Sequence, residues 1–217
     1  MVTSELSAAQ LAAFDRVGLP LVVIDPVNLP RADVVSVGAT NWSGGRSATR
    51  HLTELGHRRI AFIGGPTTSA CSQARLHGCR AALADVSVIL EPELIRYGDF
   101  SFESGLRLGA ELLDRDDPPT AVFAASDPMA VGVLTAARAR GLQVPSDLSV
   151  VGFDDSFLTE WSSPALTTVR QPLRDMGRVA LRTLIRMVTA EPLDAHHVEL
   201  ATAWWSGSPP PLLRFRP

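Results

Sequence analysis

Short apolar segments recur along the chain, and six of them run directly into polar residues. Segments of four or five mostly apolar residues bounded by polar or glycine-rich stretches are typical of buried strands. They occupy residues 21–24, 34–37, 60–63, 94–97, 121–124 and 149–153. A helical pattern follows most of these segments. Strands that alternate with helices predict an α/β fold with parallel sheets covered on both faces.

Apolar residues at helical spacing predict six helices, and two further strands complete the pattern. The helices are expected at 5–17, 44–55, 71–85, 102–114, 127–140 and 173–189. Gly56 and Gly141 are placed to end two of them, because glycine readily takes the left-handed conformation that stops a helix. A crossing strand is predicted at 166–169 and a last strand at 198–205.

The polar residues that follow the strands predict a binding site for a polar small molecule. In open parallel sheets, ligands bind outside the carboxyl ends of the strands. Asp25, Phe100, Ser126 and Asp154 all lie at such ends. Phe100 is either a loop anchor or a flat apolar wall for a sugar ring or a base. Of the adjacent pair at 154–155, one carboxylate is expected to face the cleft and the other to cap or bond to the backbone.

Arg75 is placed near the start of a helix that follows the glycine-rich end of the strand at 60–63. Arginines on helices are mostly solvated. A guanidinium at a strand's carboxyl end, however, offers a planar fork for hydroxyl, carboxylate or phosphate groups. We expect Arg75 to contact ligand, and we expect its removal to leave folding largely intact.

Two other polar motifs are interpreted as structural. Asp127 is expected to cap the helix at 127–140, with Pro128 near its first position, whereas Ser126 faces the cleft. His57 lies in the sequence GHRRI at 56–60, which joins a helix to a strand. It is interpreted as structural rather than as a metal ligand or a base.

Composition narrows the class of protein. The 217 residues are 46% hydrophobic, enough for a sizeable core, and the net charge of −3 gives no basic field that would draw nucleic acid. Cys71 and Cys79 lie on one predicted helix and cannot readily pair, which suits a reducing cytoplasm. No apolar run approaches the roughly 20 residues needed to span a bilayer, and no secretory signal opens the chain.

Motifs that accompany common enzyme chemistry are missing from the sequence. We find no Gly-x-Ser-x-Gly elbow, phosphate loop, dinucleotide fingerprint or zinc-ligand spacing. The expectation is therefore a binding protein that is not an enzyme, with no cofactor, no metal and no membrane partner.

An ordered set of motifs resembles the effector-binding region of the lactose-repressor (LacI/GalR) family of bacterial transcription regulators, over almost the whole chain. The motifs are VGATN at 37–41, HL at 51–52, GHRRI at 56–60, RLHG at 75–78, SDPMA at 126–130, VP at 144–145, SVVGFDD at 149–155 and PALTTV at 164–169.

The resemblance implies a two-lobed, periplasmic-binding-protein-like fold. Residues 1–37 and 173–200 would form the amino-terminal lobe, incomplete because its first strands are expected to be missing. Residues 38–171 and 201–217 would form the carboxy-terminal lobe. The resemblance also implies a homodimer, and operator DNA bound only through a helix-turn-helix that this chain lacks. The implied effector contacts are Asp25, Arg75, Phe100, Ser126, Asp154 and Gln171.

The implied function is effector sensing by a cytoplasmic LacI-type regulator, with a sugar or polyol bound in the cleft between the lobes to control DNA binding. A nucleobase is the second choice of ligand. A solute-binding protein for sugar uptake and an enzyme on the same scaffold are the rival classes. Ser126 stands where the family often has Asn, and Ser206 where an Arg is common, so effector identity stays open.

Overall fold

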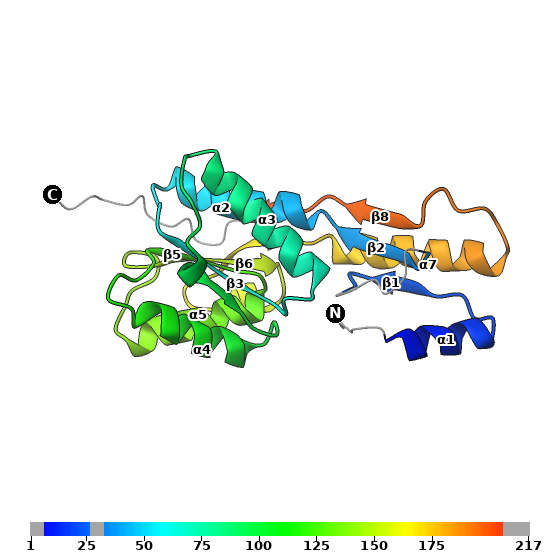
Figure 1. Ribbon diagram of the computed structural model, residues 1–217, viewed down its shortest axis with the longest axis horizontal. Helices are drawn as coiled ribbons and strands as arrows, with labels where there is room; N and C mark the ends of the chain where they lie inside the picture. The colour runs from blue at the N-terminus through cyan, green and yellow to red at the C-terminus, as the bar shows by residue number, and fades with distance from the viewer. Residues whose placement is uncertain (1–6, 27–32, 206–217) are drawn as a thin grey trace.

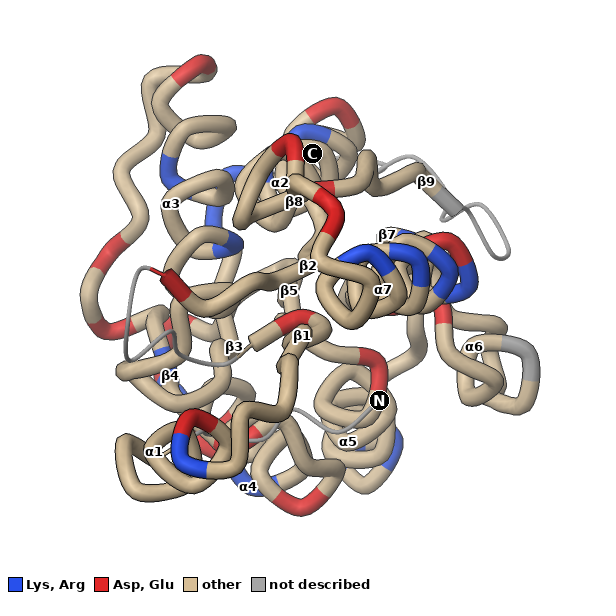
Figure 2. Tube along the Cα trace, turned by 90° about the vertical axis from the view of Figure 1, so that its right-hand side faces the viewer, with Lys and Arg blue, Asp and Glu red and all other residues tan. Residues whose placement is uncertain are grey.

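The computed structural model describes residues 7–26 and 33–205. They form two sheets of mainly parallel strands, arranged end to end (Figure 1). The smaller sheet has the strand order β1-β2-β8, with all three strands parallel. Its strands are β1 (Val22–Ile24), β2 (Val35–Ala39) and β8 (His197–Leu200). Helix α7 (Leu173–Val188) packs on β1 and β2, and lies to one side of the three strands in Figure 2.

The larger sheet has the order β4-β3-β5-β6-β7-β9, in which only β9 runs antiparallel to its neighbour. Its strands are β3 (Ile60–Gly64), β4 (Ile95–Tyr97), β5 (Ala121–Ala124), β6 (Ser149–Asp154), β7 (Thr167–Arg170) and β9 (Ala203–Trp205). The central strands are buried on both faces, as expected for a parallel sheet covered by helices. The predicted α/β class with parallel sheets is confirmed.

Helices cover both faces of the larger sheet in closely packed pairs, α2 with α3 and α4 with α5 (Figure 1). The helices are α1 (Ala8–Arg16), α2 (Asn41–Glu54), α3 (Ala70–Ala84), α4 (Phe102–Leu113), α5 (Asp127–Ala139) and α6 (Leu158–Trp161), with a 3-10 turn η1 (Pro92–Leu94). The six predicted helices are confirmed within three residues at each end, apart from the start of 5–17, which lies outside the described residues. None of the helices in the described ranges is long and apolar enough to cross a membrane.

The predicted single strand at 198–205 is wrong, because this segment contributes to both sheets. β8 pairs with β2, and the chain then crosses over and β9 pairs with β7. The crossing is fixed by Thr202, whose backbone N–H donates to the Thr40 hydroxyl at 2.9 Å, with the two hydroxyl oxygens 3.1 Å apart.

The chain passes between the two sheets three times, after β2, after β7 and after β8. We propose that these crossings mark the lobe boundaries for the described residues. The first crossing follows Ala39, two residues later than the boundary expected at 37, because Gly38 and Ala39 still pair with β8 in the smaller sheet.

Close helix contacts set the position of α3 and, with it, of Arg75. A Cβ added at Gly45 of α2 would lie 2.3 Å from the carbonyl oxygen of Arg75. In the α4–α5 pair, a Cβ at Gly105 would lie 2.2 Å from the carbonyl oxygen of Met129. Both helix pairs therefore pack with backbone against backbone, and only glycine fits at these crossing points.

The structural interpretation of His57 is confirmed. Its two ring nitrogens lie 2.9 Å from the Thr120 hydroxyl and 2.8 Å from the Ser149 hydroxyl, which ties the α2–β3 connection to β5 and β6. Burial lowers the pKa of His57 to about 4. The two predicted helix stops are confirmed as well, since Gly56 has φ +97° and Gly141 has φ +71°.

Candidate functional site

Five of the six predicted site residues line one cavity of about 560 Å³ between the two sheets. Asp25 follows β1 of the smaller sheet, whereas the other four come from the larger sheet and its helices. They are Arg75 in α3, Phe100 after β4, Ser126 before α5 and Asp154 at the end of β6. Gln171 does not line the cavity; it lies behind Asp154 and donates from Nε2 to Asp154 Oδ1 at 2.6 Å.

Arg75 is the buried centre of the site, with only 2% of its surface exposed. Its Nε donates to Asn41 Oδ1 at 2.8 Å, and its Nη1 donates to the carbonyl of Ala125 at 2.5 Å. The guanidinium carbon lies 3.7 Å from the centre of the Phe153 ring, a cation–π contact. The alternative of a solvated helix arginine is therefore wrong.

Two carboxylates flank the guanidinium without bonding to it directly. Arg75 Nη2 lies 3.8 Å from Asp25 Oδ2, and Arg75 Nη1 lies 3.8 Å from Asp154 Oδ1. These separations are too long for hydrogen bonds. A ligand hydroxyl placed between Nη2 and Oδ2 can accept from the arginine and donate to the aspartate.

Four buried polar atoms at this site have no hydrogen-bond partner within the described ranges. They are Asp25 Oδ2, Arg75 Nη2 and Ser156 Oγ, on residues that line the cavity, and Gln171 Oε1 behind Asp154. Leaving a buried polar group unpaired costs about 1–3 kcal/mol, and more for a charged one. Such groups are usually kept only where something else, such as a ligand, completes them.

Burial raises the pKa of Asp154 to about 7. The positive charge of Arg75 opposes this rise and the nearby carboxylates of Asp127 and Asp25 add to it, whereas the hydrogen bond from Gln171 lowers the pKa. Asp154 therefore changes its charge near neutral pH.

Replacing Asp154 with Asn is expected to alter the pH dependence of stability. Between about pH 4 and pH 7 the folded protein holds a proton on Asp154 that the unfolded chain, with its ordinary pKa of 3.8, has released. That proton stabilises the folded state at low pH, and the contribution is lost as pH rises through about 7. As pH rises from 4 to 8, the free energy of unfolding of the variant should therefore increase relative to that of wild type by up to about 4 kcal/mol. Urea unfolding of both proteins across this range measures the gain, and a pH-independent difference would contradict it.

Ser126 lines the cavity as expected, but it also takes the capping role that was expected for Asp127. Ser126 is the cap of α5, since its hydroxyl accepts from Met129 N at 3.4 Å, and it also donates to the carbonyl of Phe100 at 3.2 Å. Asp127 is wholly buried and accepts from Thr168 Oγ1 at 2.6 Å. It also accepts from the backbone N–H of Ser156 at 2.7 Å, and burial raises its pKa to about 6. Asp127 thus joins α5 to β7 and to the loop after β6.

Of the carboxylate pair at 154–155, Asp154 is the buried member beside Arg75, as predicted for one of the two. Asp155 also borders the cavity, but it pairs with the guanidinium of Arg170 and accepts from Thr159 Oγ1 at 3.4 Å. The expected cap or backbone bond for the second carboxylate is therefore replaced by side-chain partners.

Backbone strain is concentrated at this site. Six described residues other than glycine have positive φ, and four of them border the cavity: Asp25 (47°), Phe100 (67°), Asp154 (122°) and Asp155 (59°). Each such conformation costs about 1–3 kcal/mol and is usually retained at sites of function. Strained backbone therefore positions four of the residues that border the cavity.

Phe100 is a loop anchor packed on the core, and it also lines the cavity. Its ring occupies the space beside Gly65, where an added Cβ would lie 2.1 Å away, and it packs against the core. The same ring is part of the cavity wall.

The apolar side of the cavity was not predicted from the sequence. It is formed by Cys71, Pro128, Phe157, Leu158 and Leu173. Phe157, which is 68% exposed, makes an edge contact with Trp161 on α6, with ring centres 5.8 Å apart. In the sequence, only the two aromatic residues Phe157 and Trp161 could have indicated an apolar wall here. They were missed because the segment has neither a strand pattern nor a long helical one.

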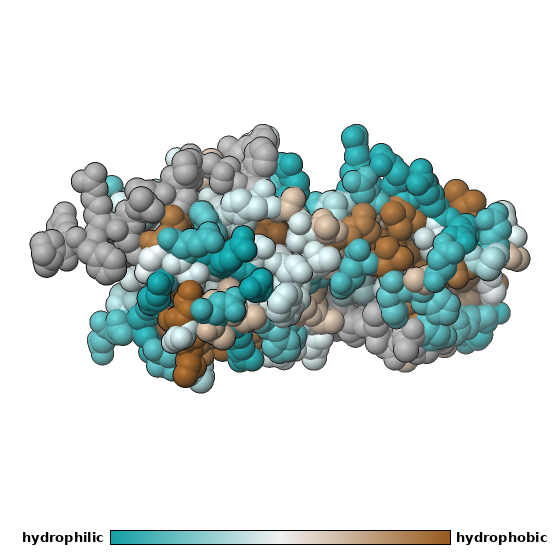
Figure 3. All heavy atoms as spheres, turned by 90° about the horizontal axis from the view of Figure 1, so that it is seen from above, coloured by the Kyte–Doolittle hydropathy of each residue, from teal (hydrophilic) through white to brown (hydrophobic). Residues whose placement is uncertain are grey.

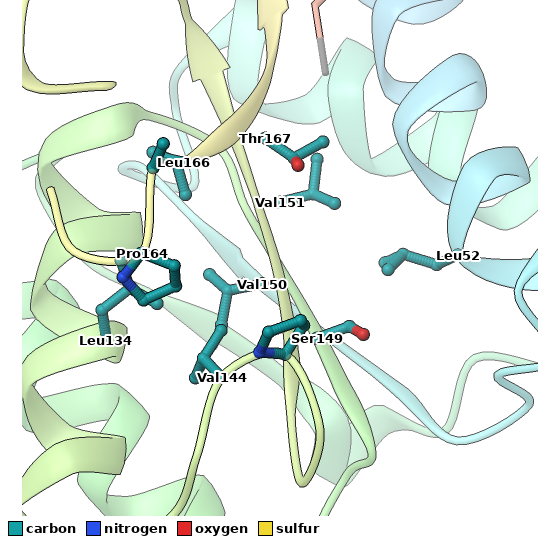
Figure 4. Close-up of a pocket in the computed structure, with 11 residues that line it drawn as sticks. Leu52, Leu134, Val144, Ser149, Val150, Val151, Pro164, Leu166 and Thr167 are labelled. Atoms are coloured by element: carbon teal, nitrogen blue, oxygen red, sulfur yellow. The ribbon is translucent and has the colours of Figure 1, made fainter. Parts of the chain in front are cut away.

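A second cavity offers no alternative site. It is about 30 Å³ in volume and is walled mainly by apolar side chains of α2, α5, β6 and the segments that precede β6 and β7 (Figure 4). That volume suits one or two waters at most. Among the described residues, no group of three or more His, Cys, Asp or Glu side chains is arranged to hold a metal ion.

Comparison with known proteins identifies the fold and the family. Residues 49–208 match the profile of the periplasmic binding protein-like domain. The regulator CelR of Thermobifida fusca is 42% identical over 189 residues, which is 87% of this chain and 56% of CelR. The repressor CytR of Escherichia coli is 40% identical over 167 residues, covering 77% of this chain and 49% of CytR. The chain belongs to the LacI family.

Solved structures agree with this assignment. The CelR–cellobiose complex superposes with a TM-score of 0.87 at 38% identity, over 95% of this chain and 63% of that protein. A LacI-family regulator from Enterococcus faecium with bound ribose superposes with a TM-score of 0.84 at 25% identity. The match covers 96% of this chain and 77% of that protein. The chain corresponds to the effector-binding region of these regulators, and it spans about half the length of the two curated relatives above.

Proposed function

We propose that this chain binds a sugar or sugar-like polyol in the cavity between the two sheets. The observation that carries the proposal is that three of the residues lining this one cavity, Asp25, Arg75 and Ser156, each have a buried polar atom without a hydrogen-bond partner among the described residues. A polyol supplies hydroxyls that both donate and accept, which is what this mixture of groups requires.

Each residue has a defined part in the proposed complex. Asp25 and Asp154 accept hydrogen bonds from ligand hydroxyls, and Arg75 donates through Nη2. Phe100 and the apolar wall pack against the carbon face of the sugar ring. Ser126 supplies a further hydroxyl, and Gln171 acts through Asp154, whose orientation it fixes.

We propose that binding controls transcription in the whole protein. The matched relatives are named as helix-turn-helix-type regulators and repressors, and operator DNA would be bound by a part of the protein outside these 217 residues. Asp25 belongs to one sheet and Arg75 and Asp154 to the other, so a bound ligand favours the lobe arrangement in which all three reach it. The action is binding without turnover, in the cytoplasm.

A solute-binding protein for sugar uptake is the alternative, since it shares the two-lobed plan. The relatives matched by this chain are regulators, which favours the sensing role. A nucleobase or nucleoside is the alternative ligand, because Phe100 can stack on it.

Titration calorimetry with cellobiose, ribose, glucose, galactose and cytidine tests the proposal. We expect saturable binding of at least one sugar at one site per chain, and its loss in the Arg75→Lys variant, which keeps the charge but not the planar fork. Saturable binding of cytidine, with no binding of any sugar, would mean that the effector is a nucleoside and not a sugar. Absence of binding to the whole panel would count against an effector site here.

We further propose that the chain forms a homodimer through the smaller sheet and α7. Leu181, Ile185 and Val188 are spaced along one side of α7 and are 59%, 53% and 68% exposed. Figure 3 shows exposed apolar side chains at the end of the molecule that holds the smaller sheet. Within the described residues, β1 is an edge strand paired only with β2, and unpaired edges favour association.

Replacing Ile185 with Arg should therefore convert the dimer to a monomer in sedimentation velocity, because it places a charge in the proposed apolar interface. The matched control is Ile89→Arg, which changes an isolated apolar residue that is 85% exposed in a loop before β4. A monomeric wild type, or an unchanged dimer in the Ile185 variant, would contradict this interface.

A further inference from the structure

We infer that the cavity selects an uncharged polyhydroxylated effector and rejects anionic derivatives of the same sugar, such as its uronic acid or its phosphate ester. The inference rests on the proposed function, since it specifies which ligands the same site accepts.

The charges around the cavity carry the inference. Among the described residues that line it, three are acidic and one is basic: Asp25, Asp154 and Asp155 against Arg75. Arg170 neutralises Asp155 from outside the cavity. Above about pH 7, where Asp154 is ionised, two carboxylates then share the single guanidinium, each at 3.8 Å. The positive charge of Arg75 is therefore already matched, and an anionic ligand would enter a site with an excess of negative charge.

Helix dipoles would favour anionic ligands and so oppose this inference, because α3 and α5 both begin at the cavity and helix amino-termini attract anions. Their first turns are, however, already engaged. The Ser69 hydroxyl accepts from Ser72 N at 3.3 Å, and the Ser126 hydroxyl accepts from Met129 N. Pro128 has no N–H, and Asp127 adds a carboxylate to the first turn of α5.

The gap between Arg75 and Asp25 gives a second, independent reason. Arg75 Nη2 needs an acceptor, and Asp25 Oδ2 needs a donor, 3.8 Å away. A hydroxyl satisfies both atoms at once. A carboxylate or phosphate oxygen can only accept, so it would satisfy the arginine and face the aspartate with like charge. A carbonyl also only accepts, so a hydroxyl is the group that fits.

The test compares ligands of matched shape by calorimetry at pH 8. Glucose and galactose are each compared with the uronic acid and with the uronamide, which has the shape of the acid but no charge. Ribose is compared with ribose 5-phosphate, and cellobiose with the uronic acid of the same disaccharide. For the sugar that binds, we expect its anionic form to bind on the order of 100-fold more weakly, and an uncharged amide to stay within about tenfold of the parent.

A charge variant adds a second readout. Asp25→Asn removes one negative charge from the cavity. It should reduce the ratio of the dissociation constants of the anionic and the neutral ligand by about tenfold. Glu54→Gln, at an exposed position on α2, changes the net charge equally and should leave the ratio unaltered. Thermal melts establish that both variants are folded.

The outcomes separate the two proposals. If an anionic derivative binds as tightly as its neutral parent, or if only anionic ligands bind, the charge selectivity is overturned while the effector site stands. If no sugar binds in either form, the proposed function fails, and the selectivity fails with it.

Discussion

Replacing Arg75 with Ala is expected to abolish effector binding and to lower the free energy of unfolding by about 3–5 kcal/mol. The guanidinium is buried, and it bonds to Asn41 and to the backbone of Ala125 while balancing the charges of Asp25 and Asp154. Removing it leaves two carboxylates without their cation and a void against Phe153. Urea unfolding measures the loss of stability, and calorimetry measures the loss of binding.

This result would differ from the expectation drawn from sequence, that Arg75 could be removed with folding largely intact. Two controls bracket the prediction. Arg50→Ala, at an exposed position on α2, should change stability by less than about 0.5 kcal/mol. Arg75→Lys should lose less stability than Arg75→Ala, because a cation remains beside the carboxylates. Wild-type stability in the Arg75→Ala variant would mean that the arginine is not the buried centre described here.

Replacing Gly45 with Ala should destabilise the protein by about 1–3 kcal/mol or more and also weaken effector binding. The new methyl group would lie 2.3 Å from the carbonyl oxygen of Arg75, so α3 must move away from α2. Because Arg75 sits on the displaced helix, its guanidinium would shift relative to Asp25 and Asp154. The same methyl group thus affects stability and the site together.

The control is Gly177→Ala, also within a helix. Nothing lies within 4 Å of a Cβ at Gly177, so this substitution should stabilise α7 by about 0.5–1 kcal/mol and leave effector affinity unchanged. Chemical unfolding and calorimetry on both variants give the comparison. Equal stability for the two variants would contradict the close packing of α2 on α3.

The sequence predicted the α/β alternation because each buried strand and each amphipathic helix has its own local pattern. It also predicted that Asp25, Phe100, Ser126 and Asp154 follow strands, and strand ends of a parallel sheet meet at one edge. The structure brings these four together. Gln171, in contrast, was expected only from family resemblance, because nothing local distinguishes a glutamine that orients a carboxylate 17 positions away.

The failed expectations share a cause in long-range contacts. Residues 198–205 look like one strand, but a contact between Thr40 and Thr202 sends the chain from one sheet to the other. Ser126 and Asp127 can each cap a helix, and the choice is made by Thr168, which holds Asp127 from 41 positions away. The apolar wall at Phe157 and Leu158 was missed because its loop has no periodic pattern.

Hydrogen exchange with and without a bound sugar tests most directly whether the cavity between the sheets is the effector site. With the sugar that binds in the calorimetric panel at saturation, slower exchange is expected in three separate segments: the end of β1 with Asp25, the start of α5 at Ser126, and the end of β6 at Asp154. Protection of both sheets is required, because the proposed ligand contacts both. Protection confined to one sheet, or found only around the small apolar cavity of Figure 4, would contradict the account.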